Sequence, residues 1–399
     1  MTVREQLHVV LEDVLTPNYD WIVLDPDADY KQVTVKLWGK GIVQRAIVKG
    51  SDIAAASQLR VKAGQFIVSR IDARHGAFGF IPPQLNGAVV SSDFPCFDVD
   101  KTRLNVRYLA WLSRTPEFVD LARSGSEGST NRVRLKEARF LKQKLILPLL
   151  AEQEAIAKQL DKAASYIEKR AKAAQSVSDN LQAMLQVVFR RITRSAPVVC
   201  LGEIAPLVRR NVKIEEEKSY TEIGIRSFYR GTFRRRTIPG SSFTWQELFS
   251  IKEHDLIFSN LMAWEGAVAI ATRSDVECVG NRRMLTCEVN LKRAVPSFIH
   301  FYFTQPEGSA RLIAASPSSI ARNRTLGPVA LHNLPVPLPS LGAQQIFDSL
   351  HTKVQAALAA HNKVEEELAN LLPALLHQTF NDHEVALPNK KATRRRAAA

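Results

Sequence analysis

The chain has 399 residues, 45% of them hydrophobic, which is enough for two or three domains with ordinary cores. Its formal net charge of +14 at pH 7 favours a polyanionic partner such as nucleic acid, and a soluble protein that is merely basic is the alternative. The polar first residues and the lack of any run of 18 apolar residues argue against a signal peptide and a membrane span.

Residues 1–150 are predicted to form a mixed α/β domain. The alternation in Tyr30–Val35 places Val33 and Val35 on one face of a strand. Residues 61–69 are typical of a turn that leads into a buried strand, and residues 106–112 of a short helix. A segment that contains proline then ends the regular structure and redirects the chain.

The next segment, residues 151–195, is predicted to be one long helix, because it has no glycine or proline between positions 153 and 191. Apolar or small residues recur in it with a period of seven, which is typical of a coiled coil. The alternative is a helix that only packs on its own globular part. The two predicted seams contain Ile156, Ala163, Val177 and Met184, and Leu160, Ile167, Ala174, Leu181 and Val188.

The second half of the chain repeats the first at an offset of about 190 residues, which indicates a duplicated domain pair. The repeat therefore predicts a second, similar domain at residues 196–341 and a second long helix at residues 342–382. Pro373 is expected to introduce a kink into this helix. Residues 383–399 form a basic tail that we expect to be disordered, with a weak phosphate contact as the alternative. The matching residues include Tyr30, Gly41, Arg45, Gly50 and Gly76, which correspond to Tyr220, Gly231, Arg235, Gly240 and Gly266.

The order of domain, helix, domain and helix predicts an α+β protein with an internal pseudo-two-fold repeat. In it, two similar mixed α/β domains are joined by two long helices that form an antiparallel coiled coil. About 40 helical residues span ~60 Å at ~1.5 Å per residue, so the helix pair would act as a ruler between the domains.

Motifs for catalysis are missing from the sequence. It contains no GxxxxGK loop, no GxGxxG, no amino-methyltransferase signature, no GxSxG elbow and no HExxH helix. Its four scattered cysteines, Cys96, Cys200, Cys278 and Cys287, form no CxxC pair and indicate a reducing cytoplasm. We therefore expect no catalytic residue, no metal site and no cofactor in this chain.

Contacts to nucleic acid are better supported, because arginine and asparagine gather at matching positions of the two halves. The loops at 70–75 and 260–265 follow equivalent buried strands and differ in chemistry, as expected for two readers of different base sequences. For any single arginine, an ordinary surface charge is the alternative. The candidates are Arg45, Arg70, Arg74, His75, Asn131, Arg132 and Arg134 in the first domain, and Arg234, Arg235, Arg236, Asn260, Trp264, Arg322, Asn323 and Arg324 in the second.

From about residue 10 to 381, the chain resembles the DNA-specificity subunit of a type I restriction–modification system. The resemblance rests on two junctions, residues 145–153 and 336–344, each of which opens a long helix with a seven-residue period. The second junction departs from the first in having Ala343 where the first has Glu152.

The resemblance implies a non-catalytic protein with two target-recognition domains, each of which reads one half of a bipartite site in double-stranded DNA. It also implies helices that set the gap between the half-sites and dock two methyltransferase subunits, which bind S-adenosylmethionine, with motor and nuclease subunits joining for restriction. Two other hypotheses remain: a single-chain DNA-modifying enzyme with an unrecognised site, and a coiled-coil scaffold that binds DNA without reading bases.

Overall fold

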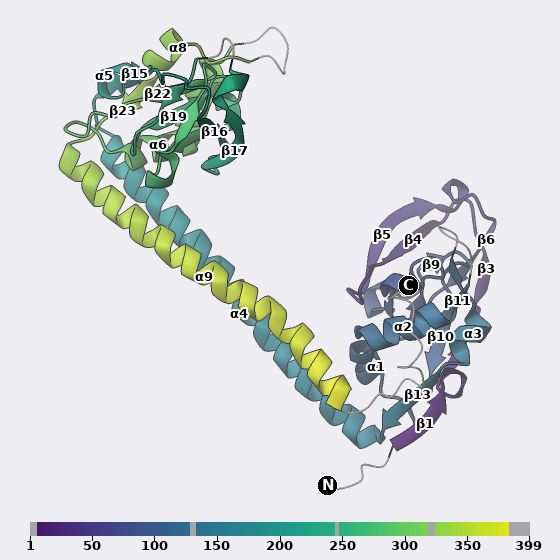
Figure 1. The fold of residues 1–399 in the computed structure, drawn as a ribbon. Coiled ribbons are helices and arrows are strands. Elements are labelled where there is room, and N and C mark those ends of the chain that lie inside the picture. Colours follow the sequence, from purple (N-terminus) through teal and green to yellow (C-terminus); the bar gives the residue numbers. More distant parts are fainter. Residues whose placement is uncertain (1–5, 128–132, 244–246, 318–323, 383–399) are drawn as a thin grey trace. The chain divides into compact units, whose positions relative to one another are not determined.

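The computed structural model describes residues 6–127, 133–243, 247–317 and 324–382 (Figure 1). The chain divides into two compact units, one of residues 1–173 and 364–399 and the other of residues 174–363. Both divisions between the units fall inside long helices, α4 (Leu150–Thr193) and α9 (Leu341–Asp382). The covalent connections between the units are therefore helical backbone.

The first unit contains a five-stranded sheet of order β3-β6-β9-β4-β5 and a four-stranded sheet of order β2-β10-β7-β8. Two pairs, β1-β13 and β11-β12, complete its strands. The strands are β1 (Gln6–Val10), β2 (Leu15–Pro17), β3 (Trp21–Val23), β4 (Asp29–Val35), β5 (Ile42–Lys49), β6 (Ser57–Arg60), β7 (Phe66–Val68), β8 (Phe78–Phe80), β9 (Val89–Val90), β10 (Cys96–Val99), β11 (Ser126–Glu127), β12 (Arg134–Leu135) and β13 (Lys144–Pro148).

Three α-helices cover the four-stranded sheet of this unit and bury aromatic side chains against it. The predicted helix at 106–112 is confirmed, and its Tyr108 is fully buried. Asn105 begins that helix because its side chain accepts hydrogen bonds from two backbone N–H groups of the first turn. The helices are α1 (Val106–Leu112), α2 (Pro116–Ser124) and α3 (Glu137–Leu141), with 3-10 turns η1 (Leu11–Asp13), η2 (Gly50–Asp52), η3 (Ala73–His75) and η4 (Pro83–Leu85).

The second unit repeats this plan, with a sheet of order β15-β22-β19-β20, a sheet of order β17-β16-β21-β18 and the pair β14-β23. In both units the parallel contact is made by the first strand of the long hairpin, β4 with β9 and β16 with β21. The strands are β14 (Val198–Cys200), β15 (Leu207–Val208), β16 (Ser219–Ile225), β17 (Thr232–Pro239), β18 (Phe249–Ser250), β19 (Leu256–Ser259), β20 (Val268–Ile270), β21 (Cys278–Gly280), β22 (Met284–Cys287) and β23 (Pro335–Pro337).

Three helices of the second unit lie 190 or 191 residues after the three helices of the first, and a fourth, α5, matches the 3-10 turn η1. Phe298, which lies 190 residues after Tyr108, is again fully buried, here in the helix that begins at Pro296. The helices are α5 (Leu201–Ile204), α6 (Pro296–Thr304), α7 (Pro306–Ala314) and α8 (Pro328–His332), with 3-10 turns η5 (Gly240–Ser242), η6 (Ala263–Glu265) and η7 (Arg273–Asp275).

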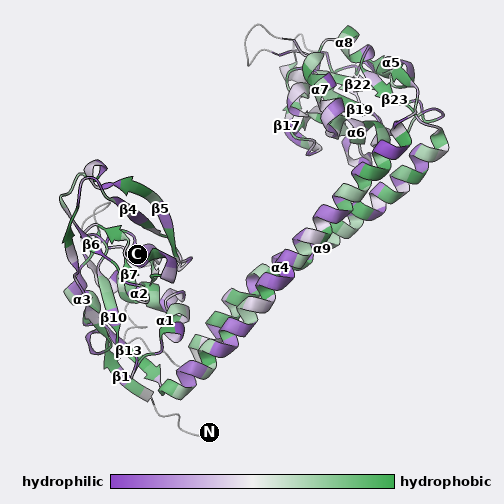
Figure 2. Cartoon of the chain, turned by 180° about the vertical axis from the view of Figure 1, so that it is seen from behind, coloured by the Kyte–Doolittle hydropathy of each residue, from purple (hydrophilic) through white to green (hydrophobic). Residues whose placement is uncertain are grey.

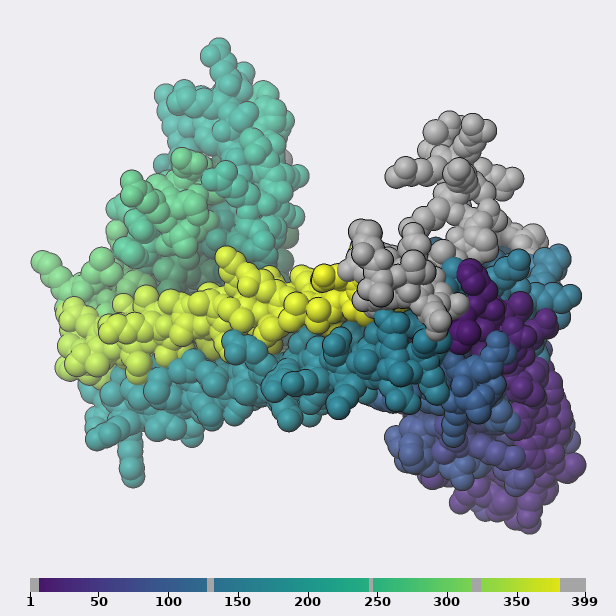
Figure 3. Space-filling model, turned by 90° about the horizontal axis from the view of Figure 1, so that it is seen from below, coloured from purple at the N-terminus to yellow at the C-terminus, as the bar shows by residue number. Residues whose placement is uncertain are grey.

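Helices α4 and α9 lie side by side, and each unit holds one stretch of the pair (Figures 1 and 3). In the first unit, Ile156 and Leu160 of α4 share a core with Phe380 near the end of α9. In the second, Phe189 near the end of α4 shares a core with Phe347 near the start of α9. The helices therefore run antiparallel, as predicted, and α9 continues through Pro373.

One of the two predicted seams of α4 is wrong in its second half. Val177 and Met184 are 51% and 38% exposed, whereas Leu185 is buried. A seven-residue repeat drifts by ~20° per heptad around a straight α-helix, so three or four heptads after Ile156 the seam has turned out of the contact. Figure 2 shows hydrophilic and hydrophobic residues alternating along both helices, which agrees with one buried face.

Each globular part is joined to its long helix by a fully buried glutamine, Gln153 or Gln344. The Gln153 side chain accepts a hydrogen bond from the Asn105 N–H at 2.9 Å and donates to the carbonyl oxygens of Arg103 and Pro148 at 3.0 and 2.9 Å. Gln344 repeats all three bonds, with Val295, Arg293 and Pro339 at 2.9, 3.2 and 2.9 Å. The glutamine of each junction motif therefore fixes the start of the long helix to its domain through three hydrogen bonds.

We expect Gln153→Ala and Gln344→Ala each to lower the free energy of unfolding by about 3 kcal/mol, because buried backbone groups lose their partners. Denaturant titration of the full chain measures the loss. The matched control is Gln182→Ala on the exposed face of α4, which should change stability by less than about 0.5 kcal/mol. Losses no larger than that of the control would show that the buried bonds contribute little.

Candidate nucleic-acid interface

The long hairpin of each unit contains a β-bulge with an arginine in it. In the β4–β5 pair, Gln32 lies opposite Ala46 and Val33 opposite Gln44, so Arg45 is the extra residue. The β16–β17 pair has its shift at the same place, and Arg235 is the extra residue there. A bulge redirects its side chain away from the regular alternation, often next to functional sites. Arg45 is exposed and has no ion pair with any residue that the structure describes.

The three arginines of β17 are exposed and partly neutralised by carboxylates. Arg236 Nε lies 2.8 Å from Glu222 Oε2, and Arg235 Nη1 lies 4.0 Å from the same oxygen. Glu222 itself is only 2% exposed. Arg234 Nη2 lies 3.5 Å from Glu277. Because the three guanidinium groups outnumber the two carboxylates, this strand presents net positive charge to solvent.

In the first unit, Arg70 leads the loop after β7 and is held by a carboxylate. Its Nη2 lies 2.8 Å from Glu137 Oε2 at the start of α3, and the Tyr19 hydroxyl donates to the other oxygen of Glu137. Burial, and next the Glu137 carboxylate, raise the pKa of Tyr19 to about 12, so this hydroxyl stays protonated. Arg70 Nε is buried and has no hydrogen-bond partner among the described residues.

Arg74 and His75 form the 3-10 turn η3 of the same loop, and both are partly exposed. Arg74 Nε is buried and has no hydrogen-bond partner within the described part of the chain. Nearby, Arg134 Nη1 pairs with Asp93 at 3.0 Å. Buried donors without a partner are unusual, and this loop contains two of them, the Nε atoms of Arg70 and Arg74.

The equivalent loop of the second unit contains Asn260 and Trp264. The Asn260 side chain donates to the Leu326 carbonyl oxygen at 2.9 Å, so its amide holds the 324–326 segment in place. The Trp264 Nε1–H donates to the Leu261 carbonyl oxygen at 2.9 Å. The guanidinium of Arg324 lies over the Trp264 ring, 5.5 Å from its centre. Two predicted residues, Trp264 and Arg324, thus meet at one surface.

The two loops share a backbone frame although their side chains differ. In the first unit, the Arg70 N–H donates to Asp93 O and its carbonyl accepts from Leu135 N, both at 2.8 Å. In the second unit, the Asn260 N–H donates to Arg283 O and its carbonyl accepts from Leu326 N, again both at 2.8 Å. The backbone framework is therefore the same in both loops. The side chains on it are arginine and histidine in the first unit, and asparagine and tryptophan in the second.

Four predicted residues, Asn131, Arg132, Arg322 and Asn323, lie outside the described residues. Sequence reasoning missed Tyr19 and Glu137, which orient Arg70, because they lie far away in the chain and have no motif. It also missed Trp38, whose ring centre is 6.5 Å from that of His75. An aromatic residue at both 38 and 228 was a signal that could have found it.

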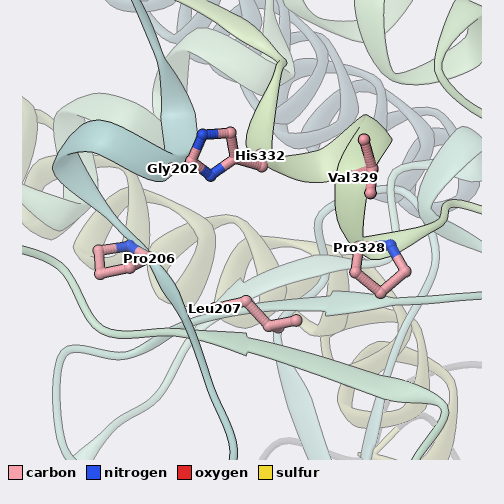
Figure 4. A pocket seen from close by; sticks show the side chains of 6 residues that line it. All are labelled: Gly202, Pro206, Leu207, Pro328, Val329 and His332. Carbon is pink, nitrogen blue, oxygen red and sulfur yellow. The ribbon is translucent and has the colours of Figure 1, made fainter.

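An open pocket of about 390 Å³ lies elsewhere in the second unit (Figure 4). It is lined by Gly202, Pro206, Leu207, Pro328, Val329 and His332, none of which is a predicted site residue. In the described parts of the chain, no three His, Cys, Asp or Glu side chains are grouped to hold a metal ion. Nor is any described helix long and apolar enough to cross a membrane.

The chain is similar in fold to the HsdS subunit from Thermoanaerobacter tengcongensis, with a TM-score of 0.59 and 16% identity over 94% of this chain and 96% of that one. It is also similar to a chain from a structure that concerns complex assembly and conformational transition of the type I R-M system, with a TM-score of 0.65 and 16% identity over 95% and 98% of the two chains. No protein-family model and no curated protein matches it. The fold is therefore that of the HsdS specificity subunits of type I restriction–modification systems, and the predicted α+β fold is confirmed.

Proposed function

We propose that this chain is the DNA-specificity subunit of a type I restriction–modification system, and that each unit reads one half of a bipartite site. The observation that carries the proposal is the pair of loops after β7 and β19. Their identical backbone hydrogen bonds display different polar side chains, Arg70 and Arg74 in one unit and Asn260 and Trp264 in the other. One framework with two chemistries is what reading two different half-sites requires.

The predicted DNA-binding residues fall into groups according to the loop or strand that holds them. Arg70, Arg74, His75, Asn260 and Trp264 belong to the loops and are assigned to base contacts. Arg45 and the β17 arginines lie on hairpin strands, and we assign them to phosphates, which fix the register of the protein on the duplex. Arg134 and Arg324, with the four residues outside the described parts of the chain, serve either bases or phosphates.

The partners in this proposal are double-stranded DNA, two methyltransferase subunits that bind S-adenosylmethionine, and motor and nuclease subunits. Support for docking comes from apolar side chains left exposed on the long helices, because such side chains are typical of a protein interface. They include Tyr166 (64% exposed), Val177 (51%), Val187 (60%) and Ile346 (73%). This chain itself needs no cofactor in the proposal, since the methylation chemistry belongs to the partners.

The proposed domains are residues 1–150 and 196–341 as recognition domains, residues 151–195 and 342–382 as helices, and residues 383–399 as a tail. We assign the protein to the cytoplasm, where its DNA substrate would lie. The four free cysteines, of which Cys96, Cys278 and Cys287 are buried, agree with a reducing compartment.

The test is to co-express the chain with type I methyltransferase subunits and to map methylated adenines in the DNA of the host. We expect one motif made of two specific half-sites and a non-specific spacer, which disappears when the chain is omitted. The purified chain alone should neither methylate nor cleave DNA. Turnover by the chain alone, or its binding of S-adenosylmethionine, would favour a single-chain enzyme.

A coiled-coil scaffold without base reading predicts a different result. Its affinity for DNA would be independent of sequence and would fall steeply with salt, because only phosphates would be contacted. Competition between duplexes that contain the mapped motif and scrambled duplexes of equal length separates the two hypotheses. Equal competition by both duplexes would contradict the proposed function.

A further inference from the structure

The tip of the long hairpin has the same unusual backbone in both units. Trp38 has a φ of +59° and Phe228, at the matching position, a φ of +61°. This left-handed region disfavours bulky side chains, and such strained residues gather at functional sites. An aromatic residue therefore stands where glycine or asparagine would be easier to accommodate.

Backbone hydrogen bonds hold each tip against the candidate recognition loop. In the first unit, Trp38 N donates to His75 O at 2.9 Å, and in the second, Phe228 N donates to Glu265 O at 2.8 Å. The tip comes so close that a Cβ on Gly76 would lie 3.1 Å from Trp38 Cα. Gly76 is itself left-handed, with a φ of +73°, and suits both requirements. The tip and the loop are thus one surface.

Packing within the units does not account for these aromatic rings. Trp38 is 57% exposed and Phe228 67% exposed, although burial is the usual reason for a large ring. Positive side chains flank both tips: Lys36 and Lys40 are exposed beside Trp38, and the Arg230 guanidinium lies 5.7 Å from the centre of the Phe228 ring. The surroundings therefore suit an aromatic, negatively charged ligand.

We propose that Trp38 and Phe228 each stack on a base of their own half-site, at a base step that the bound protein opens. Nucleobases are the aromatic groups of a polyanion, and an exposed ring with positively charged side chains near it matches that combination. The backbone strain is then explained, because it aims the ring outward from a hairpin that is anchored on the recognition loop. This inference rests on the proposed function and adds a pair of contact residues to it.

The experiment uses the complex of the full chain with methyltransferase subunits, and duplexes that carry 2-aminopurine at successive positions other than the methylated adenines. Wild type should raise the fluorescence at one position in each half-site, because the base there is unstacked. Trp38→Gly should remove the signal in one half-site only, and Phe228→Gly in the other. Each should weaken binding about 10- to 100-fold, whereas Trp38→Phe should retain most of the affinity.

Two measurements separate stacking from other effects. The salt dependence of binding should be the same for Trp38→Gly as for wild type, since no phosphate contact is lost. The unfolding midpoint of Trp38→Gly should not fall, because glycine adopts a positive φ without strain. The matched control is Trp21→Ala, which removes a 51% exposed tryptophan at the opposite edge of the five-stranded sheet.

If the wild-type complex prefers its motif and the two glycine variants bind that motif with affinities within about twofold of the wild-type affinity, this inference is overturned and the proposed function still stands. A salt slope reduced in Trp38→Gly, or a Trp21→Ala variant as defective as Trp38→Gly, would also overturn it. Wild type without any preference for the motif would overturn the proposed function first, and the stacking contact with it.

Discussion

A chain with seven residues added to both long helices is expected to keep its half-site bases and to recognise them across a longer spacer. The insertion duplicates residues 167–173 after Ala173 and residues 357–363 after Lys363, where the chain passes from one unit to the other. Seven helical residues add ~10.5 Å, which corresponds to as much as about three base pairs of ~3.4 Å each. Binding to the original site should fall about 100-fold or more, because several base contacts worth ~1–3 kcal/mol each are lost together.

Mapping methylated adenines in cells that express the altered chain gives the new motif directly. The control adds the same seven residues to α4 alone. This displaces the α4 side chains that face α9, such as Phe189 opposite Phe347, and should reduce stability without yielding a new motif. Altered half-site bases with an unchanged spacer would contradict the role of the helices as a ruler.

Substitutions of Arg74 and Arg324 should affect the two half-sites separately. Arg74→Ala is expected to relax one base position in the half-site read by the first unit. Arg324→Ala is expected to relax one base position in the half-site read by the second unit where Arg324 contacts a base, and to lower the affinity for all sequences where it contacts a phosphate. If either guanidinium forms a bidentate base contact, its loss costs ~1–3 kcal/mol and relaxes one base position, whereas a lost phosphate contact weakens binding to all sequences alike. The measurement is again the map of methylated adenines, together with the affinity for duplexes altered at each position.

The matched controls are Lys101→Ala and Lys292→Ala, which remove one exposed charge each from the turns before α1 and α6. They should leave the motif unchanged and alter affinity only slightly. An unchanged motif together with an unchanged affinity in both arginine variants would remove Arg74 and Arg324 from the recognition surface, although two separate reading units could still exist. Asn260→Ala would be a less decisive test, because the Asn260 side-chain amide also donates a hydrogen bond to the Leu326 carbonyl oxygen.

Much of the architecture could be predicted from the sequence because its signals are local or periodic. The first long helix, which lacks glycine and proline between positions 153 and 191, and the short helix at Val106 depend on patterns within short windows. The repeat at an offset of about 190 residues appears when the two halves of the sequence are compared. The glutamines at the junctions were visible as a repeated motif, but their roles as triple hydrogen-bond locks were not, since the partners of Gln153 include Arg103 and Asn105, which lie about 50 residues away.

The candidate site was located from the sequence only in outline. Loops of matching register after equivalent buried strands indicated where the recognition surfaces would lie, and the structure brings Trp264 together with Arg324 as one surface. The sequence could not show that Arg45 and Arg235 occupy bulges, because a bulge is a relation between two strands rather than a property of one.

Only the tertiary structure shows which polar groups are held by hydrogen bonds or ion pairs within the chain. Arg70 is oriented by Glu137, 67 residues away, and the left-handed Trp38 is held by a backbone bond to His75. Packing in three dimensions also explains why one predicted seam of α4 was wrong in its second half, where Met184 is exposed and Leu185 is buried. A sequence period shows which residues can share a face, whereas the helix geometry and the packed partner determine which of them are buried.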